Sequence, residues 1–235
     1  MRERYVFSGL AAILAGIGGW VVAVSYALQP PEQRVPTDVI RFLQSFAHHS
    51  LAREISYAAF AIAALFGLAV IPALYRELKE DRPGFYQWTG GLAFLGFAVT
   101  AVGNLRALTF KPYMAGVLSS SADGAKGFLA WIDPLLAMDP WGWLGGAGVG
   151  LWMIASSVIA MRRELLSLPH GLIGILAGLC YCLSSLATAV GNTNLSQILA
   201  PLALILLAPV WYVWLGVRMI RQSAYRAVPV PVLKG

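Results

Sequence analysis

The segment at residues 55–75 reads ISYAAFAIAALFGLAVIPALY and contains no charged side chain. A helix of about 20 apolar residues crosses the roughly 30 Å hydrocarbon core of a bilayer, so this run predicts a transmembrane helix. Five further runs of comparable length lie at residues 5–28, 86–108, 141–161, 171–190 and 198–220. The chain is 58% hydrophobic and 12% charged, which is more apolar surface than a soluble domain of 235 residues can bury. We therefore predict an all-α polytopic membrane protein with six transmembrane helices, forming a single membrane domain over residues 1–235.

A pentapeptide, TAVGN, occurs twice, at residues 100–104 and 188–192, and each copy closes an apolar run. The tripeptide Arg-Glu-Leu precedes both copies, at 76–78 and 163–165. Recurrence of matching segments at a nearly constant offset indicates a duplicated unit. We predict an internal tandem repeat with units at 37–104 and 123–192, each made of a surface helix, a span, a charged turn and a second span.

Two long segments between spans predict amphipathic outer helices. From Thr37 to Leu51 the apolar residues recur at helical spacing on one side. A second apolar cluster runs from Phe128 to Leu135. We expect both helices to lie on the outer bilayer surface or to cap the mouth of the bundle.

The distribution of charge predicts the orientation. With the N-terminus in the cytoplasm, the inner segments carry 11 of the 17 basic residues and 5 of the 11 acidic ones. Basic residues near span ends favour the cytoplasmic side, so both termini are expected there. The net charge of +6 is thus a topology signal. No basic stripe interleaved with stacking aromatics indicates a nucleic-acid partner.

The later spans carry signals for close packing and for kinks. Gly142, Gly146 and Gly150 form a stripe at four-residue spacing, which lets helix backbones approach each other. The alternative interpretation is close approach of the backbone to a ligand. Pro201 and Pro209 each remove a backbone hydrogen bond, so kinks are expected in the sixth span.

Polar residues near the predicted outer ends of the spans, and in the outer loops, form the candidate ligand-binding set. They are Asn104, Arg106, Asn192, Asn194, Gln197, His48, His49, Asp133 and Asp139, with Arg53 and Glu54 as further ionisable residues on that side. The two TAVGN asparagines have two interpretations, as helix stops or as paired amides in one outer pocket at a repeat interface. Arg106 either snorkels to headgroups, pairs with Asp133 or Asp139, or holds a ligand carboxylate or phosphate.

The sequence assigns no catalytic residue, metal site or cofactor. His48 and His49 are adjacent, so on a helix they point about 100° apart and are poorly placed to share an ion. Cys180 and Cys182 lie on nearly opposite sides of a helix and cannot pair. A glycine-rich phosphate loop, a zinc motif and a nucleophile elbow are all missing.

Two motifs carry a family resemblance: VIPALYREL at 70–78 and SLPHGLIGILAG at 167–178. With the basic N-terminus and the six spans, they resemble bacterial six-span membrane proteins catalogued as a domain of unknown function. The resemblance covers most of the chain. It implies a bacterial cytoplasmic (inner) membrane and supplies no catalytic residues.

The leading functional hypothesis is a membrane binding or accessory subunit. It would hold a lipid-like or other apolar ligand, or a partner helix, in the outer half of the bundle. One alternative is an enzyme acting on a lipid-like substrate at the outer interface, with His48, His49, Asp133 or Asp139 as acid or base. Another is a small-molecule transporter that uses the kinked sixth span, although no charge lies near the middle of any span as an ion-coupled carrier usually requires. The expected partners are the lipid bilayer and a larger membrane complex or further copies of the chain.

The predicted topology has a direct test. We expect an impermeant thiol reagent applied to intact cells to label Ser120→Cys and not Gln222→Cys, because the charge distribution places residue 120 outside and residue 222 inside. Both substitutions are made in a chain whose Cys180 and Cys182 are replaced by alanine, and permeabilised cells show that each new thiol is reactive. Labelling of Gln222→Cys alone would invert the orientation.

Overall fold

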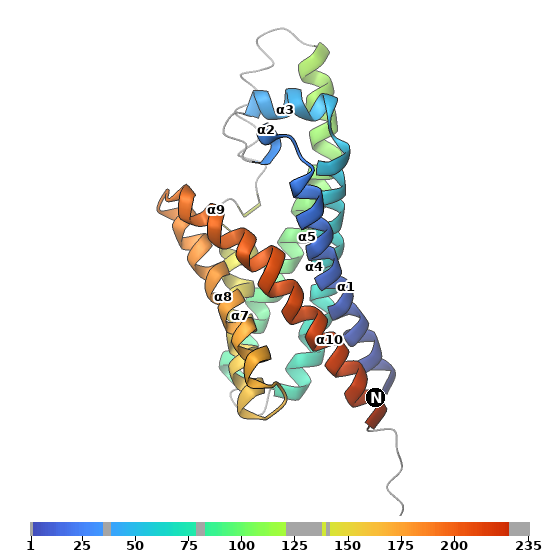
Figure 1. Cartoon of the computed structure of the whole chain (residues 1–235), viewed down its shortest axis with the longest axis vertical. Helices are drawn as coiled ribbons and strands as arrows, with labels where there is room; N and C mark the ends of the chain where they lie inside the picture. The colour runs from blue at the N-terminus through green and yellow to red at the C-terminus, as the bar shows by residue number, and fades with distance from the viewer. Residues whose placement is uncertain (1, 35–38, 79–82, 121–137, 140–141, 226–235) are drawn as a thin grey trace, which may run out of the picture.

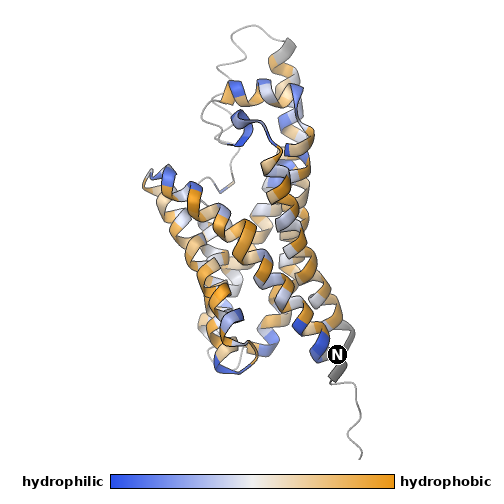
Figure 2. Cartoon of the chain, viewed as in Figure 1, coloured by the Kyte–Doolittle hydropathy of each residue, from blue (hydrophilic) through white to orange (hydrophobic). Residues whose placement is uncertain are grey.

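The computed structural model describes residues 2–34, 39–78, 83–120, 138–139 and 142–225. Six helical segments in these ranges are long and apolar enough to cross a bilayer, which confirms the predicted all-α polytopic membrane fold. Apolar residues cover most of the length of these helices (Figure 2). In chain order the spans are α1 (Arg2–Ala27), α4 (Leu51–Leu78), α5 (Pro83–Ser120), η1 with α7 (Trp143–Gly148 and Val149–Arg162), α8 (Leu168–Ala189), and α9, η2 and α10 (Thr193–Pro201, Leu202–Leu207 and Ala208–Tyr225).

The first and last spans lie side by side, because α1 packs against both α4 and α10. The helix α4 also packs on α5, α7 packs on α8, and α5 contacts η1 and α7. Two short helices, α2 (Pro31–Arg34) and α3 (Val39–His48), lie at one end of the bundle, which we call the capped end (Figure 1). The opposite end, where α1 begins and α10 finishes, is called the terminal end. Toward the capped end, α9 diverges from α1, α4 and α5 (Figure 1).

Two reciprocal pairs of glycines bring helix backbones into direct contact. A Cβ added to Gly150 of α7 would lie 2.6 Å from the carbonyl oxygen of Gly178 in α8, and a Cβ on Gly178 would meet the Gly150 carbonyl. Gly9 of α1 and Gly216 of α10 face each other in the same way, with 2.8 Å from a Gly9 Cβ to the Gly216 carbonyl oxygen. Within lipid, association depends on such close packing rather than on removal of apolar surface from water. The sequence predicts that the stripe at Gly142, Gly146 and Gly150 lets helix backbones approach each other, and Gly150 makes such a contact with α8.

The helix α3 caps the bundle by packing its apolar face on the end of α5. Its buried side chains Phe42, Leu43 and Phe46 form a cluster with Met114 and Leu118. The first predicted outer helix is therefore confirmed, and it lies on protein. The second predicted outer helix, at residues 128–135, falls outside the described residues.

The third span continues well past the predicted helix stop at Asn104. The Asn104 side chain donates from Nδ2 to the carbonyl of Thr100 one turn back, at 2.8 Å, so it follows the helix instead of ending it. The cluster with α3 stabilises the extension to Ser120. In the second TAVGN copy the helix does end, since α8 stops at Ala189 and Gly191 has a left-handed φ of +76°. The same five residues therefore adopt two conformations.

Two segments are π-helical: η1 at the start of the fourth span and η2 within the sixth. Pro201 and Pro209 flank η2, where the Ala208 N–H donates to the Ala203 carbonyl five residues back. Proline at 209 offers no N–H to the preceding turn, which explains why the regular α-helical ladder breaks there, as the sequence predicts. In η1, the Ala147 N–H donates to the Gly142 carbonyl, also five residues back, at 2.9 Å. Single π-turns of this kind are rare and occur often at functional sites.

The two Arg-Glu-Leu motifs are linked at the terminal end. Arg163 in the second motif donates from Nη1 to the Glu77 carbonyl in the first, at 2.6 Å. The Glu164 carbonyl accepts in turn from Nη2 of Arg218, at 3.0 Å. Guanidinium groups satisfy carbonyls at or beyond helix C-termini in this way. These contacts join the second, fourth and sixth spans at one end of the bundle.

The reciprocal glycine contact predicts that alanine lowers the stability of the protein at Gly178 but not at Gly103. We expect Gly178→Ala to lower stability by about 1–3 kcal/mol, because the new methyl group would meet the backbone of α7. The control is Gly103→Ala in α5, where an added Cβ meets nothing within 4 Å and alanine is the better helix former. Melting temperatures in mild detergent compare the two variants. Equal melting temperatures would contradict the close-contact interpretation.

Candidate ligand-binding cavity

A cavity of two adjoining chambers lies between the diverging helices. The deep chamber has a volume of about 340 Å³ and the mouth chamber about 420 Å³, each within the roughly 300–1,000 Å³ of small-molecule sites. The chambers share five lining residues: Val22, Phe60, Ser196, Ala200 and Leu204. Because these residues line both chambers, the two chambers are adjacent and share a wall.

The deep chamber is bounded by both π-helical segments. Gly145 and Gly146 of η1 present bare backbone to it, and Leu204 of η2 lies opposite with Ala208. A Cβ at Gly146 would meet Ser185 Oγ, so this glycine also allows α8 to approach η1. Gly150 of the stripe therefore serves helix packing, whereas Gly146 both contacts α8 and lines the cavity wall.

Hydroxyl groups of the deep chamber mostly bond to protein. The Thr188 and Ser196 hydroxyl oxygens lie 2.8 Å apart and connect α8 to α9, while Ser184 Oγ lies 3.3 Å from Ser196 Oγ. Ser185 donates to the Gly142 carbonyl at 2.7 Å and connects α8 to η1. The buried Tyr212 hydroxyl has no partner among the described residues. The chamber thus offers a ligand a mainly apolar surface.

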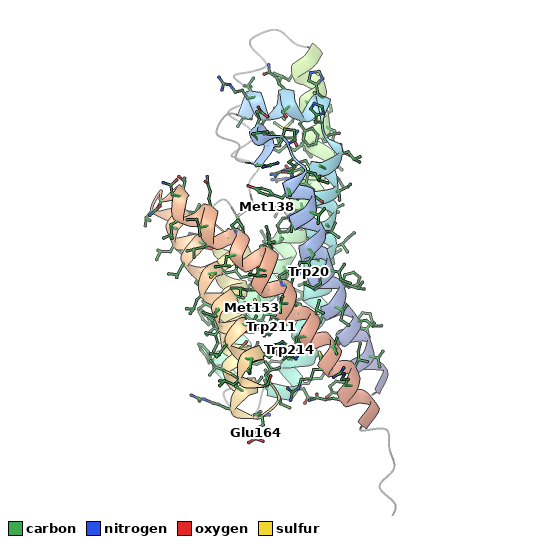
Figure 3. All side chains as sticks on the ribbon, in the orientation of Figure 1. Trp20, Met138, Met153, Glu164, Trp211 and Trp214 are labelled. Carbon is green, nitrogen blue, oxygen red and sulfur yellow. The ribbon has the colours of Figure 1, made fainter. Side chains whose placement is uncertain are left out.

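An aromatic layer closes the deep chamber toward the terminal end. Trp152 and Trp211 are fully buried, with ring centroids 6.0 Å apart, and Tyr212 packs on Trp211 at 5.0 Å. Phe97 meets the edge of Trp152 at 6.2 Å. Figure 3 shows Met153 and Trp211 within the bundle, with Trp214 nearer the terminal end. The aromatic layer therefore bounds the cavity on the side of the terminal end.

The mouth chamber is more polar and contains two cations. Arg53 of α4 and Arg34 of α2 line it together with Tyr26, Asn104 and Gln197. None of the described residues that line either chamber is an aspartate or glutamate. The cavity therefore combines an apolar depth with a positively charged mouth.

The structure brings together two of the residues that the sequence selects. Asn104 and Gln197 both line the mouth chamber. Arg106, two residues after Asn104, is half-buried and lines neither chamber. Asn192 is exposed and accepts the Leu195 N–H at 3.2 Å as the N-cap of α9. The two TAVGN asparagines therefore have different surroundings.

The other selected residues lie outside the chambers. Asn194, His48 and His49 are exposed, and neither histidine lines the cavity. Asp133 falls outside the described residues. The part of the chain that the structure describes contains no group of three or more His, Cys, Asp or Glu side chains placed to hold a metal ion.

Asp139 anchors the start of η1. Its Oδ1 accepts the N–H of Trp143 at 2.8 Å, and Oδ2 accepts those of Leu144 at 2.9 Å and Gly145 at 2.7 Å. A carboxylate is the preferred partner for unpaired N–H groups at a helix N-terminus. This geometry gives Asp139 a structural role. It fixes the start of η1, whose residues Gly145 and Gly146 line the deep chamber.

Sequence reasoning missed Arg53 and Arg34 as cavity residues. Arg53 was recognised only as one ionisable residue among several on the outer side. Its signal is its place two residues inside α4, where the first turn of a span bears a cation that must find a partner or an aqueous opening. The helix α9 completes the wall of the mouth chamber. It is distant in sequence from Arg53, so no local sequence pattern predicts that both line the same chamber.

The fold is that of a six-span membrane protein with an internal cavity. The chain belongs to the family described as domain of unknown function DUF4386, whose profile matches residues 8–221, and the predicted resemblance is thereby confirmed. No curated protein and no solved structure matches the chain.

The role of Asp139 predicts an ordered loss of stability. We expect Asp139→Ala to lower the melting temperature more than Asn192→Ala, because three N–H groups lose their acceptor in the first variant and one in the second. The expected cost is about 1–3 kcal/mol for Asp139→Ala and about 0.5–2 kcal/mol for Asn192→Ala. Asp139→Asn, which retains one acceptor oxygen, should fall between wild type and alanine. An unchanged melting temperature in Asp139→Ala would assign the carboxylate another role.

Proposed function

We propose that this protein binds an amphipathic, lipid-like molecule, with its apolar part in the deep chamber and its polar part at the mouth. The observation that carries the proposal is a cavity in which a mainly apolar chamber adjoins a more polar chamber lined by Arg34 and Arg53. Ligand sites in helical bundles commonly combine apolar walls with a few polar groups that fix orientation.

The proposed setting is the cytoplasmic membrane of a bacterium, with both termini in the cytoplasm and the capped end outside. The concentration of Arg76, Arg162, Arg163 and Arg218 at the terminal end supports this orientation. The mouth chamber then lies in the outer half of the membrane. There the protein acts as a binding or accessory subunit.

The lining chemistry supports binding over catalysis. Among the described lining residues there is no His, Asp, Glu, Cys or Lys, the side chains that most often serve as general acids and bases near neutral pH. His48, His49 and Asp139 line neither chamber. Asp133, the fourth residue of the enzyme alternative, lies outside the described residues.

Transport is the second candidate, and the π-helical segments favour it. Both η1 and η2 border the deep chamber, and broken helices commonly line the substrate sites of carriers. A carrier would also have to open the aromatic layer around Trp152 and Trp211. Movement of a monoacylglycerol between the leaflets of sealed vesicles would support this candidate over simple binding.

Filling the junction between the chambers tests the proposed function. Ala200 lines both chambers, so Ala200→Trp should reduce binding of a monoacylglycerol probe at least about tenfold, because the indole occupies the space of the ligand. Native mass spectrometry in a neutral detergent measures occupancy by the probe and by any molecule that copurifies.

The matched control is Ile198→Trp in the same helix. Ile198 is 65% exposed and lines neither chamber, so this variant should bind the probe like wild type. Equal binding by Ala200→Trp and Ile198→Trp would refute the cavity as the ligand site.

A further inference from the structure

We propose that the ligand carries a negatively charged head, a carboxylate or phosphate, and that Arg53 binds it at the mouth. This inference rests on the proposed function and adds the chemical class of the head. Three features support it: the protein groups that hold the Arg53 guanidinium, the charges around that group, and the apolar chamber next to the mouth.

The Arg53 guanidinium is held in place by protein groups. Its Nη1 donates to Oε1 of the buried Gln29 at 2.8 Å. The guanidinium carbon lies 5.0 Å from the ring centroid of Tyr57 and 5.7 Å from that of Phe42. Cation–π contacts of this length orient a guanidinium without neutralising its charge. Arg53 is therefore pre-organised as a cation at the chamber wall.

The positive charge at the mouth has no carboxylate partner among the described residues. Arg53 Nε is buried and unbonded, and its Nη2 makes no hydrogen bond within the described part of the chain. Arg34, the second cation, donates to the neutral carbonyls of Ala27 and Gln29, at 2.7 and 2.8 Å. The nearest acid in sequence, Glu54, lines a separate hollow. Partly buried charges are normally paired, so this mouth matches an anion.

Neutral amides at the same chamber complete the recognition chemistry. Asn104 and Gln197 line the mouth from α5 and α9, across from Arg53. Their amide groups add donors for the oxygens of a carboxylate or phosphate, and a guanidinium fork matches such oxygens in two parallel bonds. Because the mouth chamber adjoins the mainly apolar deep chamber and shares wall residues with it, we assign the head to an amphiphile instead of a free anion.

Three probes that differ in one property each test the head group. They are a lysophosphatidic acid, a monoacylglycerol with the same acyl chain, and inorganic phosphate, applied to the full chain in a neutral detergent. We expect the lysophosphatidic acid to bind at least about tenfold more tightly than the monoacylglycerol, the scale of one charge-assisted hydrogen-bond pair. Inorganic phosphate should bind weakly and should not displace the lysophosphatidic acid.

The matched variants are Arg53→Gln and Arg106→Gln. Arg53→Gln should abolish the preference for the anionic probe, measured as the ratio of its affinity to that of the monoacylglycerol, and a melting temperature near that of wild type shows that the fold is intact. Arg106→Gln removes one positive charge from α5 outside both chambers and should keep the preference. If Arg53→Gln does not fold, Arg53→Lys retains the charge but loses the planar fork, and the preference should fall several-fold.

The outcomes separate the two proposals. Equal binding of the two acyl probes by wild type, or an unchanged preference in either Arg53 variant, overturns the anionic head and leaves the cavity as a site for neutral amphiphiles. Inorganic phosphate that competes with the lysophosphatidic acid overturns it in favour of a free-anion site. Failure of Ala200→Trp to reduce monoacylglycerol binding removes the proposed function itself.

Discussion

Direct contact between glycine backbones holds this bundle together, because lipid provides no hydrophobic drive for its helices to associate. The Gly9–Gly216 contact joins the first span to the last, and the Gly150–Gly178 contact joins α7 to α8. Toward the terminal end the buried Trp152 and Trp211 pack edge to face in the interior. Toward the capped end α9 diverges from α1 (Figure 1), and residues of both helices line the cavity.

The wall of the cavity is built from irregular backbone that the surrounding structure stabilises. Asp139 satisfies the first N–H groups of η1, and hydroxyls of α8 satisfy or connect neighbouring segments. Backbone that departs from the α-helix is tolerated within a membrane where it is buried in protein or lines a cavity. Both π-helical segments meet this condition, so the departures from regularity and the site occur together.

Most of the fold could be predicted from the sequence, and part of the mouth. Six spans, the α3 cap and the close-packed glycines follow from composition and spacing, which are local properties. Two of the polar residues predicted as ligand-binding candidates, Asn104 and Gln197, line the mouth chamber. Arg106 was favoured over Arg53 because position along the chain does not reveal which cation meets the α9 wall. The end of the third span was placed too early because its extension depends on packing with α3, a contact distant in sequence.

The two conformations of TAVGN give the bundle walls of unequal height. The helix α5 continues to Ser120 and supports α3, whereas α8 stops at Ala189 and the chain turns back into α9. Along the long axis of the bundle, α9 does not reach as far toward the capped end as α3 does (Figure 1). With this axis across a bilayer, the rim at α9 lies closer to the bilayer centre than the rim at α3. If the protein binds an amphiphile as proposed, a molecule dissolved in the leaflet would reach this lower rim by lateral diffusion, without first passing through water. The difference between two identical pentapeptides would then set the side of the bundle from which the ligand enters.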